Sequence, residues 1–239
     1  MTPRVPRRLQ IKSWMELAQL VAVCATGRWI FRGESLVVRG HKVVQNPLRP
    51  KAGRIGRQKG AARKIPYRSK DERQALDNFV RQARPHLRHT PTSGLEWLAI
   101  AQHHGMSTRL LDWTESLLVA AYFATARAGI DVGLIYGIQN LRTLSKKEEK
   151  NPFTVKRPGI YRPPHITPRI PAQRSVFTLH ANPTVDFKPN GLCEWTIAPA
   201  ACGAIKQVLD ACAINESSLF PDLDGLSRYL GWRYKWGKP

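Results

Sequence analysis

Apolar residues recur at helical spacing in several parts of the chain. From Trp14 to Val21 they share one face of a segment that begins after Ser13, a residue type that caps helices, so a helix is predicted to Val23. The segment from Leu117 to Ala128 is apolar on all sides, which predicts a buried helix. The same spacing predicts further helices over residues 71–86, 96–103, 201–211 and 223–230.

Shorter runs of β-branched and aromatic residues predict strands at 29–33, 110–114, 132–138, 176–179 and 193–197. The polar stretch 141–162, which contains several prolines, is predicted to be mostly loop. Helices lead and strands cluster later, which favours an α+β fold. At 239 residues one domain is expected, with its helices packed on a small mixed or antiparallel sheet.

The charge of the chain is far from balanced. Lys and Arg number 38 against 17 Asp and Glu, giving a formal net charge of +21. Such a charge favours a polyanionic partner, with nucleic acid the first candidate and an anionic membrane surface the second. The alternative is a basic segment that only keeps the protein in solution.

Much of this charge lies in residues 50–70, where basic residues alternate with glycines and no acid occurs. The composition predicts a mobile basic loop that contacts nucleic acid. We expect a basic arm at 1–10, a domain at 11–231 and an aromatic, basic tail at 232–239. The candidate nucleic-acid contacts in the loop are Lys51, Arg54, Arg57, Lys59, Arg63, Lys64, Arg68 and Lys70.

The four cysteines have no metal-type spacing, so no metal site is expected. The N-terminus lacks the apolar core of a secretory signal, and no run of residues is long and apolar enough to cross a membrane. These features predict a protein of the reducing cytoplasm, with no membrane partner.

The densest group of polar side chains lies in residues 97–114, between two apolar segments. Buried polar groups need partners, so a site is expected there, with Arg109 among its residues. Because side chains alternate along a strand, Asp112 and Thr114 are predicted to share one face, opposite Leu111 and Trp113. Asp112 can also be read as a helix cap or an ion-pair partner.

Arg32 ends a predicted strand beside Gly33, where a guanidinium suits a phosphate or carboxylate. The alternative is a structural arginine paired with an internal carboxylate such as Asp112. His103 and His104 are helical neighbours that point about 100° apart, so they do not chelate one metal easily. We expect one of them to pack and the other to face a ligand.

Late in the chain, Glu194 opens a strand that stops at a proline, where it either projects into a cleft or lies on an exposed edge. Arg169, Gln173 and His180 surround another strand and suit hydrogen bonds to a ligand or to a neighbouring loop. The sequence around Asp222 is interpreted as a turn and helix cap that docks the last helix.

Several of these motifs resemble the FRG-domain family. They are Phe31-Arg32-Gly33, the segment 97–114, and the segments 168–173, 177–180 and 219–226. The matches occur in family order and extend from about Ile11 to Leu230.

The layout also resembles ADP-ribosyltransferases of the arginine–serine–glutamate class. Arg32 matches the first-strand arginine, residues 111–114 followed by 119–124 match the central strand and helix, and Glu194 matches the late glutamate. Asp-Trp-Thr replaces the usual Ser-Thr-Ser, and Leu192 stands where a second glutamate is common. The missing acid argues against modification of protein arginines, and the basic loop favours a nucleic-acid acceptor.

The resemblance implies an ADP-ribosyltransferase-like fold and NAD as the substrate. Arg32 with Gly33 would hold phosphate, Thr114 and His104 would position the nicotinamide ribose, and Glu194 would stabilise the positive charge of the transition state. The remaining candidates for the cleft lining are Arg109, Asp112 and Gln173.

The expected function is that of a cytoplasmic toxin or defence effector, with an antitoxin or inhibitor as a further partner. The alternative is a non-catalytic nucleic-acid-binding module that uses the basic loop together with Trp232, Tyr234 and Trp236. A nuclease or hydrolase lacks support because no acidic metal cluster is visible in the sequence.

Overall fold

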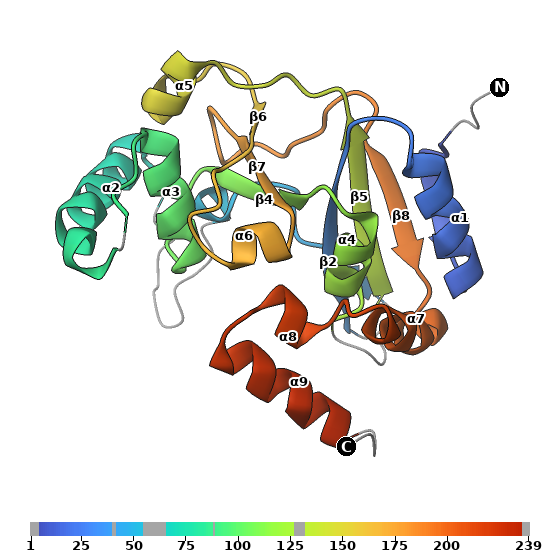
Figure 1. Ribbon diagram of the computed structural model, residues 1–239. Coiled ribbons are helices and arrows are strands. Elements are labelled where there is room, and N and C mark those ends of the chain that lie inside the picture. Colours follow the sequence, from blue (N-terminus) through green and yellow to red (C-terminus); the bar gives the residue numbers. More distant parts are fainter. Residues whose placement is uncertain (1–4, 40–41, 55–65, 88, 127–131, 236–239) are drawn as a thin grey trace.

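The computed structural model describes residues 5–39, 42–54, 66–87, 89–126 and 132–235 (Figure 1). At its centre is an open, mixed sheet whose strands follow the order β1-β8-β5-β2-β4-β7-β6, with β3 paired to β2. β1 and β8 are parallel, whereas the pairings along the rest of this order are antiparallel. The strands are β1 (Arg8–Ile11), β2 (Trp29–Arg39), β3 (Lys42–Val44), β4 (Leu110–Thr114), β5 (Val132–Gln139), β6 (Gly159–Tyr161), β7 (Ser175–Leu179) and β8 (Cys193–Ile197).

Helices form most of the remaining regular structure, so the predicted single-domain α+β fold is confirmed. The α-helices are α1 (Trp14–Cys24), α2 (Ser69–Ala83), α3 (Gly94–His103), α4 (Leu117–Ala124), α5 (Lys146–Lys150), α6 (Arg169–Ala172), α7 (Pro199–Ala211), α8 (Glu216–Leu219) and α9 (Leu223–Lys235). Short 3-10 turns occur at η1 (Lys51–Gly53), η2 (Arg84–His86) and η3 (Pro152–Thr154).

A serine caps each of α1, α3 and α4; α1 and α4 begin where they were predicted, whereas α3 begins at Gly94, two residues before its predicted start. The Ser13 side chain accepts a hydrogen bond from the Glu16 backbone N–H, which satisfies one of the free donors of the first turn of α1. Ser93 and Ser116 cap α3 and α4 in the same way. α4 ends earlier than its apolar pattern suggests, because Thr125 forms the C-cap.

Tertiary pairing extends several elements beyond their local signals. Residues 8–10, expected in the N-terminal arm, belong to β1, where hydrogen bonding to β8 orders a strand of only four residues. β2 continues well past Gly33 because it pairs with β5 as far as Leu36. The predicted loop 141–162 contains α5 and β6, and α9 continues into the segment predicted as the C-terminal tail.

One face of the sheet is covered by helices. α1, α4 and α7 pack against β2, β5 and β8, where residues such as Leu17, Ile205 and Trp195 are fully buried. α2 and α3 cover the other end of the same face, with Leu95 and Leu98 packed near Leu179 of β7. This burial is the main force that holds the helices on the sheet.

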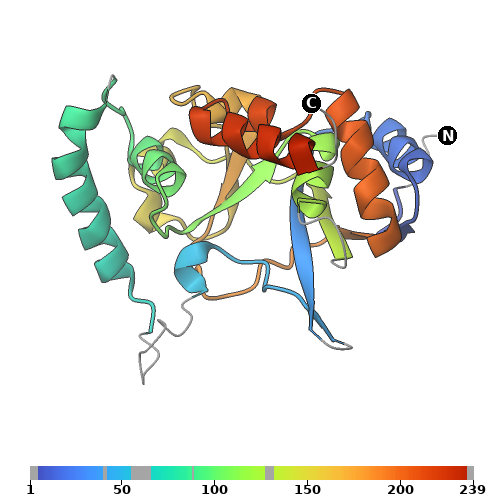
Figure 2. The same ribbon diagram turned by 90° about the horizontal axis from the view of Figure 1, so that it is seen from below.

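The opposite face is covered by loops. Leu48 and Phe187 pack against Trp113 of β4 and Tyr136 of β5 in a separate buried cluster. Figure 2 shows α4 and α7 on one side of the sheet and the segment around η1 on the other.

Near its middle, the sheet divides. Phe31 opposite Thr114 is the register pair that joins β2 to β4 in the described residues; beyond it, β2 continues along β5 and β4 continues along β7. Figure 1 shows β4 turning away from β2 at this point. α4 lies directly on the β2 side, since a Cβ atom at Gly33 would stand 1.7 Å from the Ala120 carbonyl oxygen. The division leaves room for a cleft.

No described helix combines the length and the apolar character needed to cross a membrane.

Candidate functional site

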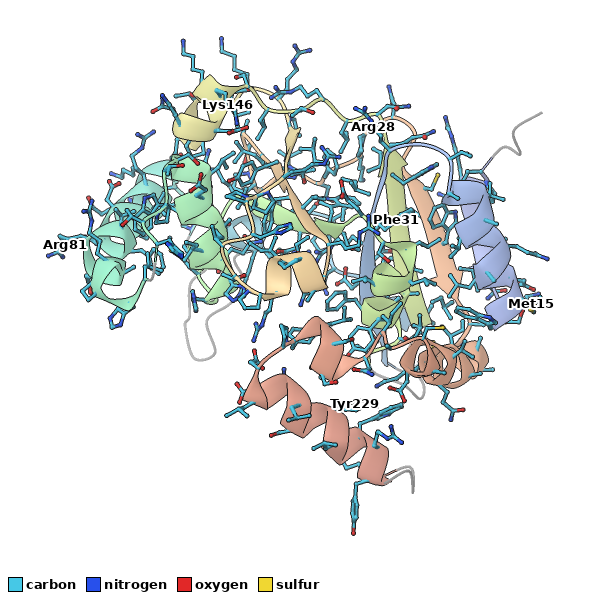
Figure 3. All side chains as sticks on the ribbon, viewed as in Figure 1. Met15, Arg28, Phe31, Arg81, Lys146 and Tyr229 are labelled. Carbon is cyan, nitrogen blue, oxygen red and sulfur yellow. The ribbon has the colours of Figure 1, made fainter. Side chains whose placement is uncertain are left out.

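The cleft opens where β2 and β4 separate. It has a volume of about 260 Å³, just below the range of about 300–1,000 Å³ that is usual for small-molecule sites. Figure 3 labels Phe31, one of its lining residues, near the centre of the sheet. The residues that line the cleft are Phe31, Arg32, Gly33, Asp112, Trp113, Thr114, Phe123, Gln173, Ser175 and Phe220.

Arg32 joins the two strands that form the cleft. Its Nη1 donates a hydrogen bond to the Asp112 carbonyl oxygen at 2.9 Å and lies 3.8 Å from the Asp112 carboxylate. Its side chain is 17% exposed, and its Nε is buried with no hydrogen-bond partner among the described residues. The two interpretations of Arg32 therefore coexist, because it pairs with Asp112 and also lines the cleft.

Asp112 and Thr114 share one face of β4, as the alternation of side chains predicts, whereas Leu111 and Trp113 pack in the cluster on the other face. The Asp112 carboxylate accepts a hydrogen bond from Gln102 Nε2 at 2.7 Å, and it is 61% exposed. The carboxylate is therefore positioned by Gln102 and is still exposed to solvent, where a ligand can contact it.

Thr114 is fixed by two hydrogen bonds. Its hydroxyl donates to the Gln173 carbonyl oxygen at 2.7 Å and accepts from the Ser116 backbone N–H at 3.0 Å. The Gln173 side chain donates in turn to the Leu219 carbonyl oxygen at 2.9 Å. These bonds tie the floor of the cleft to the start of α4 and to the end of α8.

Aromatic rings wall the outer part of the cleft. The rings of Phe123 and Phe220 meet edge to face, with centroids 6.1 Å apart. The guanidinium of Arg169 lies 5.1 Å from the Phe220 ring centroid and that of Arg228 lies 5.4 Å from it. A planar ring of a ligand would find an apolar surface here, with cations behind it.

Glu194 lines a neighbouring hollow of about 410 Å³ on the loop-covered face of the sheet. β8 lies between β1 and β5, so Glu194 is not on an edge strand. Its register partner on β5 is Tyr136, which is itself the partner of Arg32 on β2. Directly opposite residues of antiparallel strands point to the same face, so the three side chains form one row.

Tyr136 was not singled out by the sequence, because an aromatic residue in an apolar strand is usually structural. Its hydroxyl accepts a hydrogen bond from the Gln45 side chain. Burial raises the pKa of Tyr136; the hydrogen bond with Gln45 and the nearby Arg32 oppose this increase, whereas Glu194 and Glu34 add to it. The pKa of Tyr136 therefore depends on the charges of Arg32 and Glu194, on either side of it.

Glu34 was also missed, although its position two residues after Arg32 places both on one face of the strand. One carboxylate oxygen accepts a hydrogen bond from Asn46 Nδ2 at 2.5 Å. The other is buried and has no hydrogen-bond partner among the described residues. The alternation within Phe-Arg-Gly-Glu could have indicated this residue.

Arg109 is not among the residues that line the cleft. Its side chain is 1% exposed and forms an ion pair with Glu72 of α2 at 3.0 Å. It also donates hydrogen bonds to the hydroxyls of Tyr67 and Ser69, and it lies over the ring of Phe153. The arginine thus anchors α2 to the start of β4, and its position gives it a structural function.

His104 lies apart from the cleft as well, in an apolar groove between α2 and α3. Its neighbour His103 is partly buried, which lowers its pKa to about 4, and His104 contributes to this shift. His180 is buried beside Thr178, and burial lowers its pKa to about 4. Neither of these histidines lines the cleft.

Asp222 begins the last helix, as the turn interpretation expected. One carboxylate oxygen accepts from the Gly225 backbone N–H at 2.7 Å, and the other forms an ion pair with Arg169 at 2.5 Å. This ion pair connects the start of α9 to α6, next to Phe220.

The basic segment is described only at its two ends. Lys51 Nζ donates to the Gly105 carbonyl oxygen, and Arg68 forms an ion pair with Asp71. Arg54 Nε donates to the Arg49 carbonyl oxygen, and burial, followed by the nearby Arg32, lowers its pKa. Lys70 lies exposed at the start of α2, whereas Arg57, Lys59, Arg63 and Lys64 lie outside the described residues.

In the described part of the chain, no group of three or more His, Cys, Asp or Glu side chains is arranged to hold a metal ion.

Comparison with known families finds a match that includes part of the cleft lining. The model of the FRG domain matches residues 28–130, which include β2, β4 and α4, the elements that form the inner walls of the cleft. Gln173 and Glu194 lie beyond the match. No curated protein and no solved structure matches the chain. The comparison therefore shows an FRG domain at residues 28–130 of this chain.

Proposed function

We propose that the protein is an ADP-ribosyltransferase-like enzyme that cleaves NAD and transfers ADP-ribose, with nucleic acid as the acceptor. The observation that carries the proposal is the row formed by Arg32, Tyr136 and Glu194 on one face of the sheet. Neighbouring strands are about 4.8 Å apart, so the backbones of Arg32 and Glu194 are separated by roughly 10 Å. An extended dinucleotide can span this separation.

Arg32 is the group that would hold phosphate. A guanidinium is permanently charged and presents several donors, and the Nε of Arg32 is still without a partner. Its contact with the Asp112 carbonyl oxygen fixes the side chain before a ligand arrives. A side chain held in this way loses little conformational freedom on binding.

In this proposal the cleft and the hollow bind different parts of NAD. The cleft between β2 and β4 would bind one nucleoside, whose ring would lie against Phe123 and Phe220. Its ribose hydroxyls would donate to the exposed Asp112 carboxylate. The rest of the dinucleotide would have to pass Arg32 between β2 and β4 to reach the hollow that Glu194 lines, because that hollow is on the loop-covered face of the sheet.

Glu194 would act electrostatically. When the bond between nicotinamide and ribose breaks, positive charge develops on the ribose, and a fixed carboxylate nearby stabilises that charge. Nicotinamide leaves with the bonding electron pair, and a nucleophilic oxygen or nitrogen of the acceptor then forms the new bond to the ribose and loses its proton to water. Water in place of the acceptor would give hydrolysis of NAD.

The biological setting that we propose is that of a cytoplasmic toxin or defence effector neutralised by an inhibitor protein. The four cysteines support a reducing compartment, since none of them forms a disulfide in the described residues and three are buried. The net charge of +21 supports nucleic acid as the acceptor.

The first experiment measures nicotinamide release from labelled NAD by the full chain, alone and with RNA, DNA or cell extract. We expect turnover by the wild type and its loss in both Arg32→Ala and Glu194→Gln, with the label in the acceptor fraction. Matched controls are Arg81→Ala and Glu149→Gln, on α2 and α5, which change the same side-chain types and line neither the cleft nor the hollow. Absence of turnover by folded wild type with every acceptor would contradict the proposal.

A second candidate is a non-catalytic nucleic-acid-binding module, which the net charge of +21 favours. It predicts that affinity for duplex DNA falls steeply with salt, with a slope of about −0.9 for each phosphate contacted. Tyr234 at the end of α9 is 85% exposed and is available for stacking on bases. Steep salt dependence without release of nicotinamide would favour this candidate over the enzyme.

A further inference from the structure

The last helix, α9, has two faces of different character. Its inner face contacts the domain at Gly225, which packs against Phe220. A Cβ atom at Gly225 would lie 1.9 Å from the Phe220 carbonyl oxygen. Arg228 forms an ion pair with Glu216 at 2.7 Å, and Lys206 of α7 lies over the Trp232 ring. Figure 3 shows Tyr229 on the side of α9 that faces α7.

The outer face of α9 is apolar and exposed to solvent. Leu223 is 81% exposed, Leu226 43%, Leu230 54% and Tyr234 85%. Their spacing of three, four and four residues places them along one stripe of the helix. We call these four side chains the α9 stripe.

The α9 stripe is unusual for this molecule. Among the described residues, large exposed apolar side chains outside it occur singly, at Met15 of α1 and at Val185 in a loop. Scattered exposed residues of this kind need no explanation, whereas a contiguous apolar stripe marks an interaction site. Arg233 and Lys235 of the same helix add positive charge beside the stripe.

The charge of the chain decides which partner fits. A second copy would bring another net charge of +21 against the first, and the two would repel each other. An acidic protein reduces this repulsion and is attracted from a distance. An amphipathic helix that carries carboxylates around an apolar face would match both the stripe and the surrounding charge.

We propose that the α9 stripe is the docking surface for an amphipathic helix of an acidic partner protein. The position gives such a partner access to the cleft. Phe220, which lines the cleft, lies three residues before the start of α9 and contacts it at Gly225, so a partner seated on α9 lies next to the aromatic wall of the candidate site.

The test uses two peptides of about twenty residues, a length at which a helix can form in water. The first places leucine at every third or fourth position and glutamate at most others. The second has the same composition in scrambled order, so that it keeps the charge and loses the apolar face. Binding of each to the full chain is measured by calorimetry, for the wild type, Leu230→Ser, Tyr234→Ser and the control Met15→Ser.

We expect the amphipathic peptide to bind the wild type and Met15→Ser equally, and the scrambled peptide to bind much more weakly. Leu230→Ser and Tyr234→Ser should each lower the affinity for the amphipathic peptide about tenfold, which is typical when a side chain that anchors an interface is removed. Both substituted residues are exposed, and circular dichroism verifies that the variants are folded.

Three results would overturn the proposal. Equal binding of both peptides would mean that only the net charge attracts them, and no binding of either would remove the docking surface. A dimer of the wild type, seen by light scattering and lost in Leu230→Ser, would assign the α9 stripe to a second copy instead. None of these outcomes depends on whether the protein cleaves NAD.

Discussion

Arg32 and Glu194 lie on the same face of the sheet with a single strand between them. Each is the register partner of Tyr136, so the tyrosine stands between a cation on β2 and a carboxylate on β8. Arg32 also lines the cleft between β2 and β4, whereas Tyr136 and Glu194 line the hollow on the loop-covered face. This relationship joins the part of the chain that matches the FRG domain to a strand that lies outside the match.

Replacement of Tyr136 by phenylalanine tests the importance of this middle position. The ring that packs against Leu48 and Phe187 remains, whereas the hydroxyl that accepts from Gln45 is lost. We expect nicotinamide release to fall about tenfold, because the loss of one positioned hydrogen bond costs on the order of 1 kcal/mol. The urea midpoint should change little. Unaltered turnover in this variant would show that the hydroxyl has no function in the reaction.

The buried ion pair of Arg109 and Glu72 gives a strong prediction for stability. Arg109→Met leaves a carboxylate that is 3% exposed without its cation, and the free energy of unfolding should fall by about 3–5 kcal/mol. The double variant Glu72→Leu with Arg109→Met removes both charges and should regain much of this loss. Urea denaturation of the three proteins measures the effect. A single variant as stable as the wild type would contradict the assignment of a structural function to Arg109.

Gly33 permits the close contact between β2 and α4. Gly33→Ala would place a Cβ atom 1.7 Å from the Ala120 carbonyl oxygen. The clash is with the backbone of α4, which cannot move aside as easily as a flexible side chain. We expect a loss of stability of about 1–3 kcal/mol or more, together with a distorted cleft. The matched control is Gly203→Ala in α7, where no atom lies within 4 Å. That substitution should stabilise the protein by about 0.5–1 kcal/mol, because alanine favours the helix. Equal behaviour of the two variants would refute the steric explanation.

Stability should fall in mild acid because of His180. Burial holds its pKa at about 4 in the folded protein, below the ordinary value of 6.5. As the pH falls, the unfolded chain therefore takes up the proton before the folded protein does. Above pH 6.5 His180 is neutral in both states, and its effect on stability does not depend on pH. Stability is lost as the pH falls from 6.5 towards 4, by up to about 1.4 kcal/mol for each pH unit of this window.

Urea midpoints at several pH values between 7 and 4 measure this dependence. His180→Gln should flatten it, although part of the slope will remain because the pKa of His103 is lowered in the same direction. The exposed His86 provides the control, since His86→Gln should leave the slope unchanged. An identical slope in His180→Gln and the wild type would exclude His180 as the source.

Local features of the sequence determined much of the secondary structure. Serine residues before α1, α3 and α4 mark their starts, because a cap needs only the backbone of the next turn. Alternation along residues 110–114 placed Asp112 and Thr114 on one face, since it depends only on the geometry of a single strand. The motif around Arg32 likewise indicated a residue that lines the cleft.

Only the tertiary structure decided which distant groups meet. Arg109 has the same residue type as Arg32 and lies within the same polar segment as Asp112, yet it pairs with Glu72 and is buried. Glu194 is aligned with Arg32 through Tyr136, a residue with no polar signal around it. The register of paired strands and the partner of a buried charge depend on segments far apart in the chain. Local periodicity carries no information about them, whereas the packed sheet fixes both.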